Sequence, residues 1–194
     1  MNPLSAAVHA LEQQRALDAV AVPVRDLVAR VTGPEPVSQL LGGEWLGHPV
    51  HPILVHLPLG GWAMAAVLDH LGGPEAEDAA DLLVLTGIAG YFPAAATGAH
   101  DWSRTDGPAT RVGLAHAGLN AVGLALHLGS LAARRAGNRP LGLALSAAGL
   151  GAVGVGGYLG GHLAYGNAVG VRGTGERHPA RELRPRPTTV RGHV

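Results

Sequence analysis

The 194-residue sequence contains no cysteine, and aromatic residues make up only 4% of it. The absence of cysteine excludes disulfides, thiolate-ligated metal sites and an iron–sulfur cluster held by this chain. Charged residues are also scarce, at 14% of the chain, whereas soluble domains carry about 25%. The 14 basic residues, all of them arginine, balance 14 acidic ones. This composition excludes a strongly basic or strongly acidic protein, so the placement of the apolar residues carries most of the information.

Four long apolar runs follow one another along the chain, at about residues 53–71, 79–99, 112–133 and 141–163. A helix of about 20 residues is about 30 Å long, which matches the hydrocarbon core of a bilayer. The connections between the runs are short and therefore predict antiparallel neighbours. We predict an all-α integral membrane protein with a four-helix up-down-up-down bundle, in preference to a soluble helical bundle.

The flanking segments are more polar than these runs. Residues 3–31 show a modest amphipathic pattern broken at Pro23, which predicts two short helices on the membrane surface or against the bundle. The arginine- and proline-rich end of the chain is predicted to be disordered. We divide the chain into an N-terminal amphipathic helical segment (1–44), a four-span bundle (45–171) and a disordered tail (172–194).

Arginines are distributed unequally between the two ends of the predicted bundle. Eleven lie at the end that holds both termini, whereas the opposite end holds Arg134, Arg135 and Arg139. Because arginine-rich segments remain in the cytoplasm, we predict that both termini are cytoplasmic.

Histidines of all four spans gather at this predicted cytoplasmic end. They precede or begin the first span, close the second, begin the third and end the fourth: His48, His51, His56, His100, His116 and His162. Polar side chains at a membrane mouth tend to face the bundle interior and to mark function. Imidazole is a common ligand of metals and of heme iron. We therefore predict a histidine layer at one depth, with scattered surface histidines as the alternative.

Such a layer could bind one of two groups. The first is a b-type heme whose iron is coordinated by His56 and His116 from facing helices, with His162 as the substitute. Pro58 and Pro93 are expected to bend their helices near this level, which either opens a pocket beside His56 or serves packing alone.

The second group that such a layer could bind is a metal ion. The side chains that could coordinate it are those of His48, His51, His100 and Asp101, since imidazole and carboxylate are suitable metal ligands. Asp101 could instead orient an imidazole by accepting a hydrogen bond from its N–H group. No complete set of catalytic residues is found, so the sequence leaves open whether the protein is an enzyme.

Four ordered motifs, spread over about residues 10–171, resemble a bacterial membrane family. They are G-H-P-V-H-P-I-L at 47–54, A-T-G-A-H-D-W at 96–102, G-L-A-H-A-G-L-N at 113–120 and G-G-Y-L-G-G-H-L-A-Y-G-N-A-V-G-V at 156–171. The family is the four-span domain-of-unknown-function family 2231. The resemblance implies a multi-pass protein of the cell inner membrane, and His48, His51 and His116 fit the family pattern. Relatives are sometimes fused to a Rieske domain, which implies redox work with a Rieske-type partner on a separate chain.

We therefore expect a membrane redox or electron-transfer component that contacts the lipid bilayer and a separate redox protein. A non-catalytic membrane scaffold or assembly subunit is the alternative, and a metal-dependent membrane enzyme is a third hypothesis. No nucleic-acid partner is expected, because arginines beside a membrane are better explained by anionic lipid. The sequence leaves open whether the protein forms a homo-oligomer.

Overall fold

The computed structural model describes residues 2–171, and within this range the chain is helical without any strand. Four segments are long and apolar enough to cross a membrane: His51–Leu71, Pro74–Trp102, Gly107–Arg135 and Arg139–Tyr165. The prediction of an all-α bundle with four candidate spans is therefore confirmed. The predicted tail at 172–194 lies outside the described residues.

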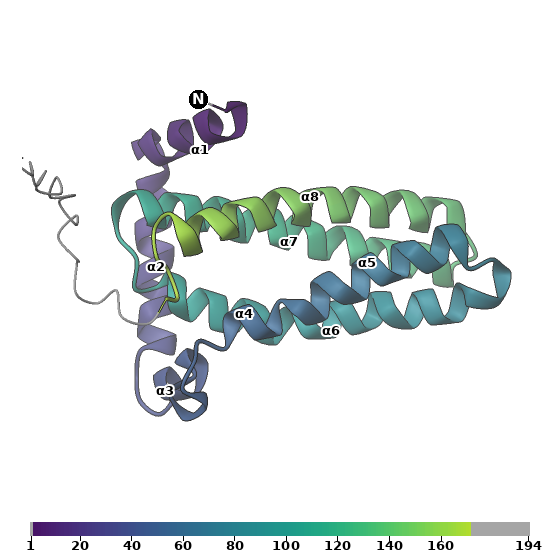
Figure 1. The fold of residues 1–194 in the computed structure, drawn as a ribbon, viewed down its shortest axis with the longest axis horizontal. Helices are drawn as coiled ribbons and strands as arrows, with labels where there is room; N and C mark the ends of the chain where they lie inside the picture. The colour runs from purple at the N-terminus through teal and green to yellow at the C-terminus, as the bar shows by residue number, and fades with distance from the viewer. Residues whose placement is uncertain (1, 172–194) are drawn as a thin grey trace, which may run out of the picture.

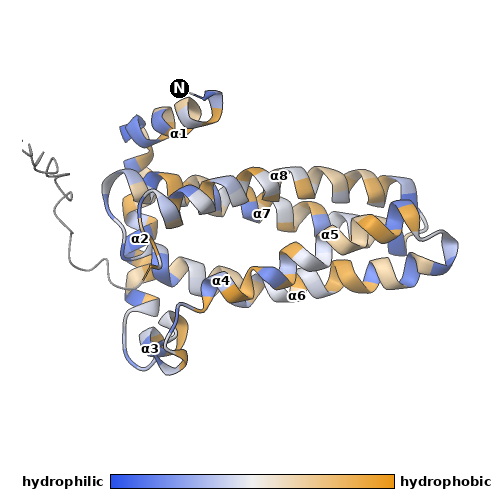
Figure 2. Cartoon of the chain, viewed as in Figure 1, coloured by the Kyte–Doolittle hydropathy of each residue, from blue (hydrophilic) through white to orange (hydrophobic). Residues whose placement is uncertain are grey.

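The bundle consists of two helical hairpins (Figure 1). In the first hairpin, α4 (His51–Leu54) and α5 (His56–Leu71) lead through the short η3 (Pro74–Ala76) to α6 (Glu77–Trp102). The second hairpin contains α7 (Gly107–Arg135) and α8 (Arg139–Tyr165). Apolar residues are spread along both hairpins (Figure 2), as expected for helices that face lipid.

The first span is interrupted where α4 ends and α5 begins. Pro58 has no N–H to donate to the carbonyl of Leu54, the last residue of α4. In α6, by contrast, the helix continues through Pro93. The expected effect of proline on the helix is therefore seen in the first span as a break.

Three helices lie across one end of the bundle (Figure 1), and we call them the platform and this end the platform end. They are α1 (Pro3–Gln13), α2 (Asp18–Thr32) and α3 (Val37–Gly42), with η1 (Arg15–Leu17) and η2 (Glu44–Leu46) between and after them. The predicted break at Pro23 is wrong, because α2 continues through it and the interruption falls at Gln14. Ala19 and Pro23 are both exposed, so water can satisfy the Ala19 carbonyl that loses its helical partner.

An ion pair fastens α2 of the platform to α7. The Arg111 Nε and Nη2 atoms each donate to the Asp18 carboxylate at 2.7 Å, and Nη1 donates to the Glu12 carbonyl at 2.5 Å. The hydrogen bonds from Arg111 hold the pKa of Asp18 below its usual range. Val8 of α1 adds an apolar contact, because it is buried in a cluster with Val112 and Leu159.

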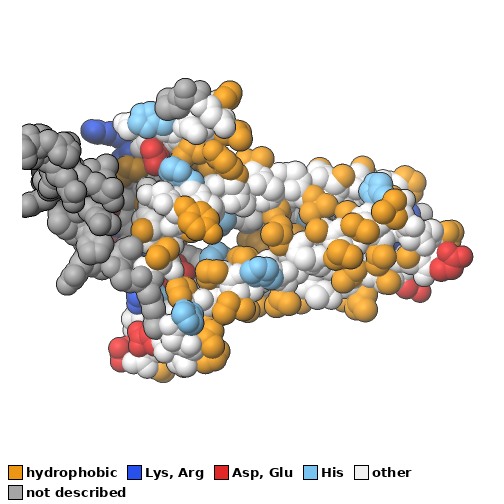
Figure 3. Space-filling model, in the orientation of Figure 1, with side chains coloured by type: hydrophobic (Ala, Val, Ile, Leu, Met, Phe, Trp, Pro, Cys, Tyr) orange, Lys and Arg blue, Asp and Glu red, His pale blue; other side chains and the backbone are white. Residues whose placement is uncertain are grey.

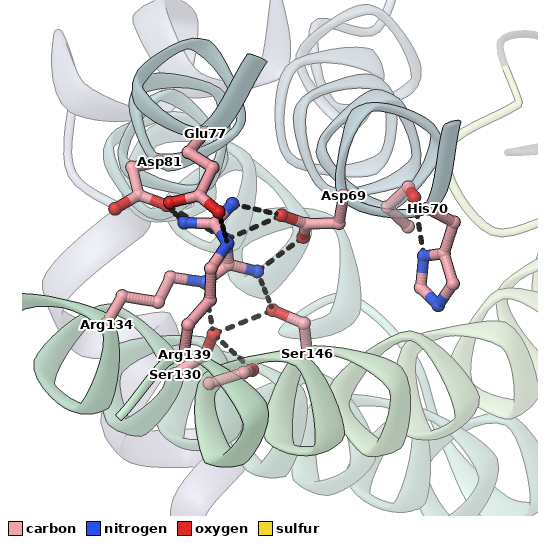
Figure 4. A network of polar contacts seen from close by, with 10 residues as sticks. Asp69, His70, Glu77, Asp81, Ser130, Arg134, Arg139 and Ser146 are labelled. Atoms are coloured by element: carbon pink, nitrogen blue, oxygen red, sulfur yellow. Dashed lines mark hydrogen bonds and ion pairs between the residues drawn. The ribbon is translucent and has the colours of Figure 1, made fainter. Parts of the chain in front are cut away.

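At the opposite end, which we call the loop end, a network of ion pairs joins the two hairpins (Figure 4). The Arg134 side chain is fully buried and donates from Nη1 and Nη2 to Asp69 at 2.8 and 2.5 Å. Asp81 accepts from Arg134 at 2.9 Å and from Arg139 at 3.2 Å. Ser130 accepts the remaining Arg134 donor, Nε, at 3.0 Å. Every donor-bearing nitrogen of this buried guanidinium is thus satisfied, as a buried charge requires.

Candidate functional site: two histidines between the hairpins

The hairpins diverge toward the platform end, and the space-filling surface is hollowed between them (Figures 1 and 3). His51 lies in the first helix of the first hairpin, and His116 lies in the first helix of the second. Both residues lie in the half of their hairpin that is nearer the platform end. One imidazole from each hairpin is therefore present in the same part of the bundle.

The His51 ring is held by α6 of its own hairpin. Its Nδ1 atom is 2.8 Å from the Ala94 carbonyl oxygen. Since a carbonyl can only accept, Nδ1 must carry the proton, and Nε2 keeps its lone pair. Gly98, one turn after Ala94, makes room for the ring, because a Cβ there would lie 2.6 Å from its Cε1 atom. The backbone of α6 therefore fixes both the position and the tautomer of this imidazole.

The His116 ring is held by α8 in a similar way. Its Nδ1 atom is 2.7 Å from the Gly156 carbonyl oxygen, so its Nε2 also keeps a lone pair. A Cβ on Gly160, one turn later, would lie 2.9 Å from the ring. The Asn120 amide nitrogen is 3.3 and 3.2 Å from the two ring nitrogens and donates to the His116 carbonyl at 2.8 Å. These nearly equal distances put the amide beside the ring, out of line with the Nε2 lone pair.

Three other histidines use their rings locally. Each directs Nδ1 at a carbonyl three or four residues earlier in the chain: His56 at Ile53, His70 at Ala66 and His127 at Gly123. These bonds stay within one span; only the His127 ring of the three is also buried, where it stacks on Trp62 of the first hairpin. His51 and His116 differ because each reaches a carbonyl of the neighbouring helix, 43 and 40 residues away in sequence.

The three predicted heme ligands are placed differently from one another. His116 faces α8, whereas the His56 side chain is exposed and bonds to Ile53. The His162 Nε2 atom is 2.8 Å from the Glu12 carboxylate, so this ring is engaged with α1 of the platform. Within residues 2–171, no hydrogen bond or ion pair connects any two of these histidines. The ring that is held like that of His116, by a carbonyl of the neighbouring helix, is His51, which the sequence assigned to the metal set.

The four predicted metal ligands also lie in different surroundings. His48 is exposed and borders a shallow apolar pocket, while the His100 ring is fully buried against Gly42. Asp101 lines a pocket of about 890 Å³ beside Arg104, and this pocket shares Pro49 and Gly170 with the one at His48. In the described part of the chain, no three His, Asp or Glu side chains are grouped so that they could hold a metal ion.

Sequence reasoning missed the groups that position the two rings. They are the carbonyls of Ala94 and Gly156, which are invisible in a side-chain motif, and the glycines at 98 and 160. A usable signal was present in the second helix of each hairpin, where glycine stands two residues before a histidine, at Gly98 and Gly160. The buried pair of Asp69 and Arg134 was also missed, because both were treated as charges near loops.

The fold and its four apolar helices define the class of this chain, a multi-pass membrane protein. The chain belongs to the DUF2231 family, described as predicted membrane proteins, since the family's sequence model matches residues 47–173. The matched region includes both hairpins and excludes α1 to α3. No curated protein and no solved structure matches the chain.

Proposed function

We propose that this protein is a membrane redox component that binds a b-type heme between its hairpins through His51 and His116. One observation carries the proposal. Two imidazoles from different hairpins each donate Nδ1–H to a backbone carbonyl and keep the Nε2 lone pair. An Nδ1–H bond to a carbonyl is the usual arrangement of a histidine whose Nε2 binds a metal centre.

The surroundings of the rings support heme over a bare metal ion. A bis-histidine heme needs two imidazoles, whereas structural and catalytic metal ions are held by three or more protein ligands. Two imidazoles are what the space between the hairpins offers, and residues 2–171 contain no larger ligand group. Gly98 and Gly160 place each ring close to its supporting helix, which leaves the hollow between the hairpins for a ligand.

The roles of the residues follow from these contacts. His51 and His116 are the ligands, and the Ala94 and Gly156 carbonyls orient them and increase their basicity. A bound heme would supply one-electron transfer. The chain contributes the low-dielectric surroundings that tune such a centre, together with the two fixed imidazoles.

The test is an absorption spectrum of the full chain purified from membranes of cells supplied with heme. We expect a Soret band that shifts on reduction, and its loss in both His51→Ala and His116→Ala. The variants His56→Ala and His70→Ala are matched controls, because these rings are exposed and bond to their own helix. A colourless wild-type protein, or a band that survives in His51→Ala and His116→Ala, would overturn the proposal.

The redox assignment also includes an orientation and a partner. We propose that the platform end faces the cytoplasm and that a separate Rieske-type or other redox protein exchanges electrons there. The unequal distribution of arginine supports this orientation in a bacterial inner membrane. Because the chain has no cysteine, Thr105→Cys and Glu75→Cys can be labelled singly with a membrane-impermeant maleimide. Labelling of Thr105→Cys in intact spheroplasts would contradict this orientation.

A scaffold or assembly subunit is the second candidate, and the outer side of α2 favours it. Four apolar residues on this helix are exposed with heptad-like spacing: Val20, Val24, Leu27 and Val31. Such a stripe suits the docking of another helix. A colourless protein that copurifies with a stoichiometric partner, lost in Leu27→Ser/Val31→Ser, would support the scaffold and count against heme.

A further inference from the structure

Contacts between the two hairpins join residues at corresponding positions. In the first helices, two such contacts join residues that are 65 positions apart: Trp62 with His127 and Asp69 with Arg134. The Trp62 and His127 rings are stacked, with centroids 4.0 Å apart and planes 9° from parallel. His51 and His116, nearer the platform end, have the same offset.

The second helices correspond with an offset of 62 residues. Glu77 and Arg139 are related by this offset, and they form an ion pair of 3.3 Å between the hairpins. The supporting carbonyls of Ala94 and Gly156 have the same offset. The offset is three residues smaller than in the first helices, because the connection within the second hairpin is shorter.

The glycines that pack against aromatic rings are related by the same offset of 62 residues. Gly98 receives the His51 ring and Gly160 the His116 ring, while Gly87 receives the Trp62 ring and Gly149 the His127 ring. Each ring therefore fits against its partner helix at the position that the offset predicts. His100 and His162 are also related by it, and both are histidine.

We infer that the bundle is a fused pair of equivalent hairpins, related by a pseudo-twofold axis that runs parallel to the helices. In a twofold pair, residues close to the axis meet their own counterparts. Parallel repeats of this kind are known among membrane proteins. Three cross-hairpin contacts between counterparts, one in the middle of the bundle and two at the loop end, fit this arrangement.

This inference deepens the proposed function and, as far as the ligand is concerned, rests on it. With His51 and His116 as counterparts on opposite sides of the axis, the ligand meets two equivalent imidazoles. A planar macrocycle with two similar faces meets this requirement, whereas a small ion that needs further ligands does not. The ligand site is therefore shared equally between the hairpins.

The counterparts at the loop end have diverged into complementary charges. The first hairpin supplies the carboxylates of Asp69 and Glu77, and the second supplies the guanidinium groups of Arg134 and Arg139. Two copies of the same hairpin would place like charges together, which is unfavourable. These opposite charges favour the pairing of the first hairpin with the second over the pairing of two identical hairpins.

The experiment exchanges counterparts in the middle of the axis, in the full chain. We expect Trp62→His and His127→Trp to lower the melting temperature by about 5 °C or more as single variants. In the double variant Trp62→His/His127→Trp, the indole enters the equivalent place beside Gly149, so the melting temperature should return to within about 3 °C of wild type.

The matched control exchanges two residues of the same buried cluster that are not counterparts, Trp62→Leu/Leu131→Trp. It conserves composition and core volume, and we expect no recovery. Equal losses in the two double variants would overturn the pseudo-twofold arrangement. Absence of heme would instead overturn the proposed function alone, because melting measures the exchange without any ligand.

Discussion

The two ends of the interface between the hairpins use polar groups in opposite ways. At the loop end, Arg134 and Asp69 satisfy each other and are almost fully buried, at 0% and 1% side-chain exposure. At the platform end, His51 and His116 each bond through one nitrogen only to the backbone and retain a lone pair on the other. The first end is closed by the protein's own groups, whereas the second keeps bonding capacity for a ligand.

The two ends therefore contribute differently to the bundle. The loop end holds the two hairpins together, and the platform end leaves space between them. Ion pairs between buried groups set the relative heights of the helices, because each guanidinium has fixed donor directions. Fastening at the loop end lets the hairpins diverge at the platform end without separating (Figure 1).

Arg134→Ala should have the largest effect. It removes the fully buried guanidinium between Asp69 and Asp81 and leaves them only the more exposed Arg139. Breaking a buried pair by removing one member costs about 3–5 kcal/mol, and the remaining Arg139 places the expected loss toward the lower end of this range. Thermal unfolding of the purified protein in detergent measures this loss of stability.

Arg135→Ala is the matched control for this loss. Arg135 is the next residue of α7 and is exposed, so its removal should change stability by about 0.5 kcal/mol or less. Similar melting temperatures for the two variants would show that the network does not fasten the hairpins.

The loop-end network also shows the limits of sequence reasoning about the fold. Length and low charge were enough to predict four spans, because a bilayer demands about 20 apolar residues for each. The position of Asp69 close to the end of its span did not reveal that Arg134, 65 residues later, is its partner. Pairings between distant residues depend on helix rotation, which periodicity in weakly amphipathic spans does not define.

At the platform end, sequence reasoning grouped the histidines by height along their helices but did not predict which neighbours each ring has. His56 and His116 have similar distances from their helix starts, which suggested equal height. The break between α4 and α5 and the rotation of the first span leave His56 exposed, while His51 faces α6. Carbonyl partners such as Ala94 have no side-chain signal, so this part of the site required coordinates.

An intermediate effect is expected where glycines support the two rings. Gly98→Ala and Gly160→Ala each place a methyl group against the imidazole of His51 or His116, 2.6 and 2.9 Å from its Cε1 atom. Overpacking of this kind costs about 1–3 kcal/mol. If the hairpins are equivalent, the two variants should lose similar amounts of stability and of Soret absorbance.

Gly157→Ala serves as the control on the same helix, since nothing lies within 4 Å of the added methyl group. In a helix, alanine is more favourable than glycine, so this variant should be unchanged or slightly more stable. Loss of absorbance in Gly157→Ala to the same degree would mean that α8 responds to any added methyl group and not to crowding of His116.

The smallest effect concerns the ion pair between Asp18 and Arg111, which holds α2 of the platform against α7 at the platform end. Because the pKa of Asp18 is lowered from 3.8, its contribution is complete above the ordinary carboxyl pKa and is lost as the pH falls through the lowered value. A spin label on Ala19→Cys, an exposed position of α2, should become more mobile as the pH falls through this lowered pKa. Asp18→Asn should show this mobility already at pH 7, without further change on acidification.

Asp26→Asn is the control, because Asp26 pairs with Arg25 of the same helix. A label equally rigid in Asp18→Asn and wild type would show that apolar contacts of the platform suffice without this ion pair.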